Sequence, residues 1–280
     1  MSEERTGEGA WRGAKEGLVA ALGLLLLLGV GKHLAPLLPL GNDLVFTLAA
    51  AFQLYVPLWL IQRAGELPES HRIHVHGLIL GDVQALRRRR VEARRRRGER
   101  RSTRLDQALA YYGRHARFEP RAFFQDIGRA LLVAVLTFVP FAIGHHLWQQ
   151  WMAPAGARVT YSLTIPPDLV AITLKNVFLV ALPEELFYRG FLETRLERVW
   201  PTRWSVLGIP LGRAVILASA LFALGHFVGE YNPARLGPFF PAFLFSMLAR
   251  KSGSIAGAVT YHGLSNAFSA TLLAGYHVLR

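Results

Sequence analysis

The chain has 280 residues, of which 52% are hydrophobic, and it carries a formal net charge of +13. It contains no cysteine, which excludes disulfides, a thiolate nucleophile, lipidation on sulfur and any metal site built from cysteine. The apolar residues are grouped in long blocks separated by loops that hold nearly all the charge, a pattern that excludes a soluble α/β domain. The sequence therefore predicts an all-α, polytopic transmembrane helical bundle.

Seven blocks approach the ~20 residues that cross a ~30 Å hydrocarbon core. They cover residues 10–31, 44–61, 130–152, 169–192, 214–228, 236–248 and 255–279. No small-residue cleavage site follows the first block, so we expect it to remain as an anchor rather than to act as a signal peptide. The sixth block is short, and Pro238 and Pro241 predict an irregular start.

These blocks divide the chain into three parts. Residues 1–62 form two N-terminal transmembrane helices, residues 63–128 form an arginine-rich loop or amphipathic segment, and residues 129–280 form a transmembrane core. From Arg63 to Arg129 the chain holds 17 of its 32 Lys and Arg residues against eight acids. Because basic loops stay in the cytoplasm, we expect the N-terminus there and the C-terminus outside.

The other loops agree with this orientation. It places 27 basic residues in cytoplasmic segments, Arg189 and Arg195 among them, and five outside. The composition, rich in Arg, Ala, Leu and Gly, is typical of a bacterial protein. We therefore expect a multi-pass protein of the bacterial inner (cell) membrane.

The arginine-rich loop has two interpretations. Its runs from Arg87 to Arg90 and from Arg94 to Arg97 suggest phosphate contacts with nucleic acid. We favour a segment that lies on anionic lipid headgroups, and we do not expect nucleic acid as a partner. Apolar contacts with the membrane would come from Leu86, Val91, Leu105, Leu109, Tyr111 and Tyr112.

Two groups of histidines receive a structural interpretation. One lies beside two tryptophans at the end of the third block, which is typical of an interfacial aromatic belt: His145 and His146, with Trp148 and Trp151. The other alternates as metal ligands can, but nothing of matching spacing lies nearby, and we assign it to a solvated loop: His71, His74 and His76.

Polar residues inside three of the blocks need a reason, because a charged side chain in hydrocarbon costs at least ~2.5 kcal/mol on insertion scales. In the fourth block Glu184 and Glu185 point about 100° apart on a helix, so they cannot serve one site in the same way. Glu185 and Arg189 stand at i and i+4, which suits an internal ion pair. Glu184 is then free to face the bundle interior.

The fifth and seventh blocks carry the remaining polar residues. His262 and Asn266 lie one turn apart on one helix stripe, and His226 follows Gly225, where a missing side chain would let another helix approach. Counting ~1.5 Å per residue from charged interface residues places three of these groups at one depth, nearer the outer half of the membrane: Glu184, His226 and His262.

This set fits hydrolytic chemistry. A carboxylate beside an imidazole can take a proton from water and pass it to a leaving amine. A second imidazole and an amide can donate hydrogen bonds to a tetrahedral oxyanion.

The three motifs together carry a family resemblance. Glu184-Glu185-x-x-x-Arg189, Phe222-x-x-x-His226 and His262-x-x-x-Asn266, in this order on separate blocks, resemble the CPBP family of CAAX proteases and bacteriocin-processing (Abi-type) enzymes. The resemblance spans about residues 165–275.

The resemblance implies a glutamic intramembrane endopeptidase that acts on a membrane-embedded or membrane-anchored protein or peptide. It implies that Glu184 and His226 activate water, that His262 and Asn266 stabilise the oxyanion, and that Glu185 and Arg189 are supporting residues. A bacterial source makes a prenylated substrate unexpected, and the chain is similar to myxosortase-like members thought to trim C-terminal membrane tails of exported proteins.

Two alternatives stay open. The residues Glu184, His226 and His262 would bind zinc in a metal-dependent protease, although the expected set needs no cofactor. In a transporter or immunity protein, buried Glu and His would instead carry protons or ions.

Overall fold

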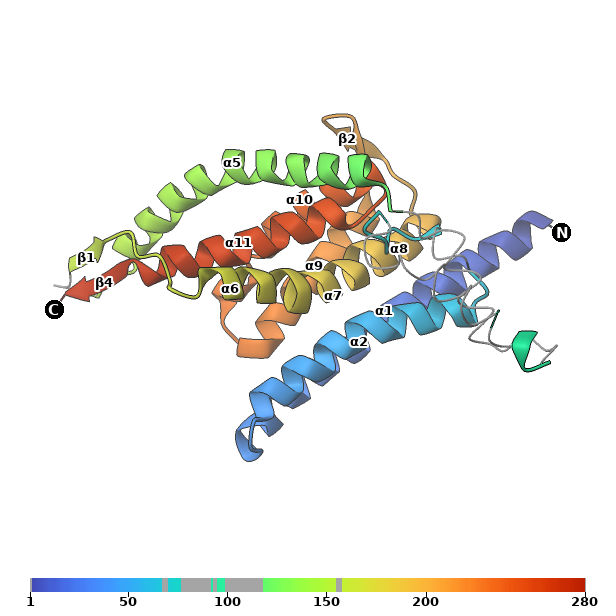
Figure 1. Cartoon of the computed structure of the whole chain (residues 1–280), viewed down its shortest axis with the longest axis horizontal. Coiled ribbons are helices and arrows are strands. Elements are labelled where there is room, and N and C mark those ends of the chain that lie inside the picture. Colours follow the sequence, from blue (N-terminus) through green and yellow to red (C-terminus); the bar gives the residue numbers. More distant parts are fainter. Residues whose placement is uncertain are drawn as a thin grey trace.

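The computed structural model describes residues 2–66, 70–76, 92, 95–98, 118–154 and 158–279. These residues form an elongated bundle of helices (Figure 1) with two short antiparallel strand pairs. The all-α membrane bundle is confirmed. The α-helices are α1 (Ser2–Leu34), α2 (Gly41–Arg63), α5 (Pro120–Trp151), α6 (Leu169–Lys175), α7 (Leu182–Glu185), α8 (Glu193–Val199), α9 (Arg213–Glu230), α10 (Phe239–Ser252) and α11 (Ala256–Ala274).

The fourth pass is helical throughout, and its residues alternate between α-helical and π-helical hydrogen bonding. Between α6, α7 and α8 lie two π-helical segments, η3 (Asn176–Ala181) and η4 (Leu186–Leu192). Two 3-10 turns, η1 (Ala35–Leu37) and η5 (Pro233–Leu236), precede α2 and α10. The predicted irregular start of the sixth pass is thus confirmed, and its regular helix begins only at Phe239.

Within the described ranges, four helices are long and apolar enough to cross a membrane: α1, α2, α5 and α9. The fourth pass is divided among short elements, α10 has 14 residues, and α11 carries the polar stripe. A helix that packs against other helices need not be apolar all round, because only its lipid-facing side contacts hydrocarbon. The chain is an integral membrane protein.

Successive passes run in alternating directions along the bundle (Figure 1). The N-terminus, α8 and β2 (Trp204–Val206), which pairs with β3 (Ile209–Leu211), lie at one end. At the opposite end the C-terminal strand β4 (Tyr276–Leu279) pairs antiparallel with β1 (Arg158–Tyr161). The seventh block therefore ends as helix at Ala274 and not at 279, because the chain there forms a strand with β1.

Small residues bring the helices together. Alanines are buried at the contacts of α1, α5, α9, α10 and α11, among them Ala21, Ala134, Ala218, Ala249 and Ala258. In lipid, where the hydrophobic effect does not drive helices together, such residues permit the close packing that does. Large apolar side chains on the outer faces, such as Val135 of α5 and Leu26 of α1, are exposed, as expected of surfaces that contact lipid.

The segment 70–76 corrects one prediction. It is not a solvated loop, since His71 is 1% and His76 9% exposed. Nε2 of His76 donates to Oδ2 of Asp126 over 2.9 Å, and the carbonyl oxygen of His74 accepts from the backbone N–H of Ile255. The segment is held beneath α5 and the start of α11 because its polar groups find partners on both.

A layer of buried ion pairs lies at the same end of the bundle. Arg195, fully buried on α8, contacts Glu16 at 2.9 Å and Glu66 at 3.1 Å, and Glu193 accepts from Arg250 at 2.6 Å. Arg189 and Arg195, which the charge count placed in cytoplasmic segments, are in fact buried in the bundle. Burial of a guanidinium is tolerated because each one faces a carboxylate.

Much of the arginine-rich loop lies outside the described residues, including the runs up to Arg94 and the six apolar positions assigned to the lipid surface. In the described part, Arg96 contacts Glu92 at 3.0 Å in an exposed i, i+4 pair. Near the opposite end of α5, Trp148 and Trp151 are exposed and lie 5.2 Å apart by ring centroid. Their exposure fits the interfacial belt assigned to them.

Candidate active site

Two adjacent carboxylates and one histidine form the centre of the site. Glu184 and Glu185 lie in α7, between the two π-helical segments. Such segments interrupt the regular hydrogen-bond ladder and recur at functional sites. His262 comes from α11 and is 3% exposed.

Both carboxylates are directed at the ring of His262. Nδ1 of His262 donates to Oε1 of Glu185 over 2.8 Å, and Nε2 lies 3.6 Å from Oε2 of Glu184. The two carboxylates, expected from the sequence to need separate explanations, thus approach one imidazole from its two nitrogens. The second distance is longer than a hydrogen bond. Glu184 therefore lies beside Nε2 of His262 without a hydrogen bond to it.

The expected ion pair between Glu185 and Arg189 is present. Nη1 of Arg189 donates to Oε1 of Glu185 over 3.1 Å, and both side chains are almost wholly buried. The guanidinium also lies 4.4 Å from the ring centre of Phe222 and 5.0 Å from that of Phe245. Aromatic faces attract a cation, so this cage holds Arg189 in the position that fixes Glu185.

His226 on α9 has a fixed tautomer. Its Nδ1 lies 3.0 Å from the carbonyl oxygen of Phe222, one turn earlier. A carbonyl can only accept, so Nδ1 carries the hydrogen and Nε2 keeps its lone pair. The ring of Phe222 lies 4.6 Å from His226 and 5.7 Å from His262 by centroid, so both histidines lie next to one aromatic ring.

Asn266 lies one turn beyond His262 on α11 and is partly exposed. Its amide makes no hydrogen bond with any residue that the structure describes, and His226 makes no ion pair with Glu184 there. The described contacts therefore bring together Glu184, Glu185, Arg189 and His262. They place His226 and Asn266 on α9 and α11 without a hydrogen bond or ion pair to this group.

Glycines let the helices approach at this level. A Cβ on Gly263 would lie 3.0 Å from Cα of Val177 in η3 and would also collide with the Val177 side chain. A Cβ on Gly225 would lie 3.3 Å from Oη of Tyr188 and 3.6 Å from Leu28 of α1. The close approach expected at Gly225 is therefore seen, and α1 is one of the helices that make it.

The residues of the zinc alternative do not form a metal site in this arrangement. Across the described ranges, no three His, Asp or Glu side chains converge in a way that would hold a metal ion. At His262 both ring nitrogens face carboxylates, one of them at hydrogen-bond distance.

The sequence analysis missed Phe245 of α10, whose ring stacks on His262 at 4.5 Å with a 13° interplanar angle. No motif marks this position. The only signal is its place on the helical stripe with Ala242 and Ala249, all of which are buried. A stacked ring restricts the imidazole to one plane, so Phe245 contributes to its orientation.

The fold and this group of residues define an integral membrane protein with an acid–imidazole cluster inside its helical core. Residues 166–268 match the family described as Type II CAAX prenyl endopeptidase Rce1-like. The match covers 103 of the 280 residues, and it includes all three motifs, from Glu184 to Asn266. This region is therefore similar to that family, in agreement with the resemblance that the motifs carry. No curated protein and no solved structure matches the chain.

Proposed function

We propose that the chain hydrolyses a peptide bond of a membrane-associated protein with a water molecule activated by Glu184 and His226. The observation that carries this proposal is the carboxylate of Glu184. Its Oε2 is buried, makes no hydrogen bond within the described part of the chain, and faces His262. A carboxylate kept in a membrane bundle without a structural partner is expected to have a functional one.

The roles follow from which atoms are engaged. Glu184 takes one proton from a water molecule whose other hydrogen is held by Nε2 of His226, the water oxygen bonds to the peptide carbonyl carbon, and the C=O π pair moves onto the oxygen as the oxyanion. The proton then passes to the leaving amine. The ring of His262, held by Glu185, and the amide of Asn266 donate hydrogen bonds to the oxyanion.

The depth of the site in the membrane limits which proteins could be its substrates. Glu184 stands nine residues from Lys175 and fifteen from Val199, about 13 and 22 Å along a helix. With the N-terminus in the cytoplasm, the site lies nearer the outer face. We propose that it removes C-terminal tails or matures exported proteins, and the family description adds prenylated peptides as a second substrate to test.

The experiment uses the purified full chain in lipid nanodiscs. Cleavage of a peptide with a C-terminal membrane tail, and of a farnesylated CAAX peptide, is followed by mass spectrometry for wild type, Glu184→Gln and Glu119→Gln. Glu119 is exposed and serves as the matched control. We expect Glu184→Gln to lower the rate about 10²–10⁴-fold and Glu119→Gln to leave it unchanged; wild-type cleavage by Glu184→Gln would overturn the assignment.

A further inference from the structure

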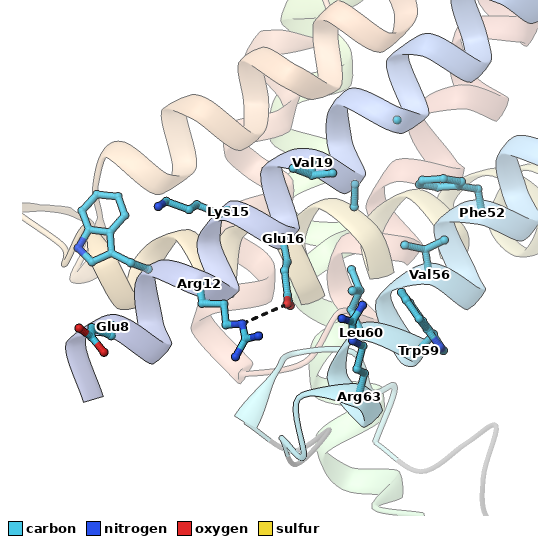
Figure 2. Close-up of a pocket in the computed structure, with 13 residues that line it drawn as sticks. Glu8, Arg12, Lys15, Glu16, Val19, Phe52, Val56, Trp59, Leu60 and Arg63 are labelled. Atoms are coloured by element: carbon cyan, nitrogen blue, oxygen red, sulfur yellow. Dashed lines mark ion pairs between the residues drawn. The ribbon is translucent and has the colours of Figure 1, made fainter. Parts of the chain in front are cut away.

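A groove between α1 and α2 lies outside the candidate active site. It has a volume of about 900 Å³ and is lined by Glu8, Trp11, Arg12, Lys15, Glu16, Val19, Ala20 and Gly23 of α1 and by Phe52, Val56, Trp59, Leu60 and Arg63 of α2. Figure 2 shows Arg12 and Glu16 on α1 near Leu60 and Arg63 of α2. The groove therefore follows the seam between two antiparallel helices.

The two ends of the groove differ in chemistry. Charged residues and two tryptophans line the end nearest the N-terminus. Apolar residues of both helices, among them Val19 of α1 and Phe52 of α2, line the other end. From Glu8 to Gly23 the groove extends about 22 Å along α1. One leaflet with its headgroups is about as thick, half of the ~40–45 Å of a whole bilayer.

The polar end carries an excess of positive charge. Arg12, Lys15 and Arg63 face Glu8 and Glu16, but Glu16 is already paired with the buried Arg195 at 2.9 Å. Its other contact, with the largely exposed Arg12, is 4.0 Å long and weak. Glu8 can balance one of the three cations, so two positive charges remain to attract an anion.

The tryptophans fix the depth of this end. Trp11 is 49% and Trp59 55% exposed, and the guanidinium of Arg63 lies 5.3 Å from the ring centre of Trp59. Exposed Trp rings beside basic side chains are typical of the headgroup level of a membrane. The groove thus has a cationic end at the level of the headgroups and an apolar end within the hydrocarbon. This shape and charge match one anionic phospholipid.

We propose that this groove binds an anionic phospholipid, with the phosphate at the end lined by Arg12, Lys15 and Arg63 and an acyl chain along Val19, Val56 and Phe52. The contact is independent of catalysis. Lipid binding in the groove requires both the cations and the apolar end of the groove. The attraction of headgroups to the arginine-rich loop requires only positive charge.

The test is native mass spectrometry of the full chain in detergent with added phosphatidylglycerol or phosphatidylcholine. We expect wild type to retain phosphatidylglycerol preferentially. The variant Arg12→Gln/Lys15→Gln/Arg63→Gln should lose on the order of one hundred-fold in affinity, about five-fold per cation. Val19→Trp, which fills the channel and keeps every charge, should also weaken binding.

The matched control is Arg203→Gln/Arg213→Gln/Lys251→Gln, which removes the same charge from exposed positions at the same end of the bundle. It should bind like wild type. Equal losses in both triple variants would show a general charge effect and overturn the proposal, as would full retention of phosphatidylglycerol by the groove variant or by Val19→Trp. Thermal unfolding of each variant checks that it is folded.

Discussion

Oε1 of Glu185 lies 2.8 Å from Nδ1 of His262, and the two residues are separated by 77 positions in the chain. The same oxygen accepts from Arg189. One carboxylate therefore both neutralises a buried guanidinium and orients the imidazole. A first prediction follows from this double role.

Glu185→Gln should lower stability by roughly 3–5 kcal/mol, because it leaves the Arg189 charge buried without its partner. Adding Arg189→Met removes that charge and should restore most of the stability. Cleavage should stay low in the double variant, since His262 still lacks its orienting carboxylate. Thermal unfolding and peptide cleavage together separate the two roles; recovery of activity along with stability would show that Glu185 is only structural.

Gly263→Ala should lower both stability and cleavage, because the added Cβ meets Val177 and forces α11 away from η3, displacing His262 from Glu184. Overpacking of this kind costs about 1–3 kcal/mol. The control is Gly128→Ala on α5, where a Cβ meets nothing within 4 Å and helix propensity improves. If both alanine variants unfolded at the wild-type temperature, the close approach would have no energetic weight.

Asp126→Asn should loosen the segment 70–76. Asp126 accepts from His76 at 2.9 Å and from Arg129 at 2.6 Å, and loss of such charged hydrogen bonds costs about 1.5–3 kcal/mol. Hydrogen exchange measured by mass spectrometry should increase in peptides that cover 70–76. Asp168→Asn, at an exposed position, is the control, and unchanged exchange in Asp126→Asn would contradict the anchoring role.

Cleavage should withstand a chelator such as EDTA. The proposed mechanism assigns the proton transfer to Glu184 and His226 and uses no metal ion. Activity is measured after dialysis against chelator, with and without added zinc. Loss of activity that zinc alone restores would favour the metal-dependent alternative.

The orientation in the membrane can be measured directly, because the chain has no cysteine and single cysteines can be introduced. Ser205→Cys in the β2–β3 pair should be labelled by an impermeant maleimide only after cells are lysed. Thr164→Cys, at the opposite end of the bundle, should be labelled in intact cells. Both positions are exposed, and the reverse pattern would invert the predicted topology.

The sequence predicted where long apolar helices occur, but it did not predict where each of them ends, as the last helix shows by ending at Ala274. Blocks of apolar residues reflect the thickness of hydrocarbon, so α1, α2, α5 and α9 could be recognised from composition. Charge in a polar-looking segment was misleading in two places. His76 was expected in water, yet it is buried beside Asp126. Arg189 was counted by its charge alone, and its side chain is buried beside Glu185.

What the sequence alone determined is which residues need a reason to be in the membrane: Glu184, Glu185, His226, His262 and Asn266 stand in blocks where hydrocarbon penalises polarity. Helical spacing also determined the pairing of Glu185 with Arg189, since i and i+4 are neighbours on any helix. The tertiary structure decided that both carboxylates meet the same His262 and that Phe245 stacks on it. Contacts between distant segments depend on how whole helices pack, which no local pattern encodes.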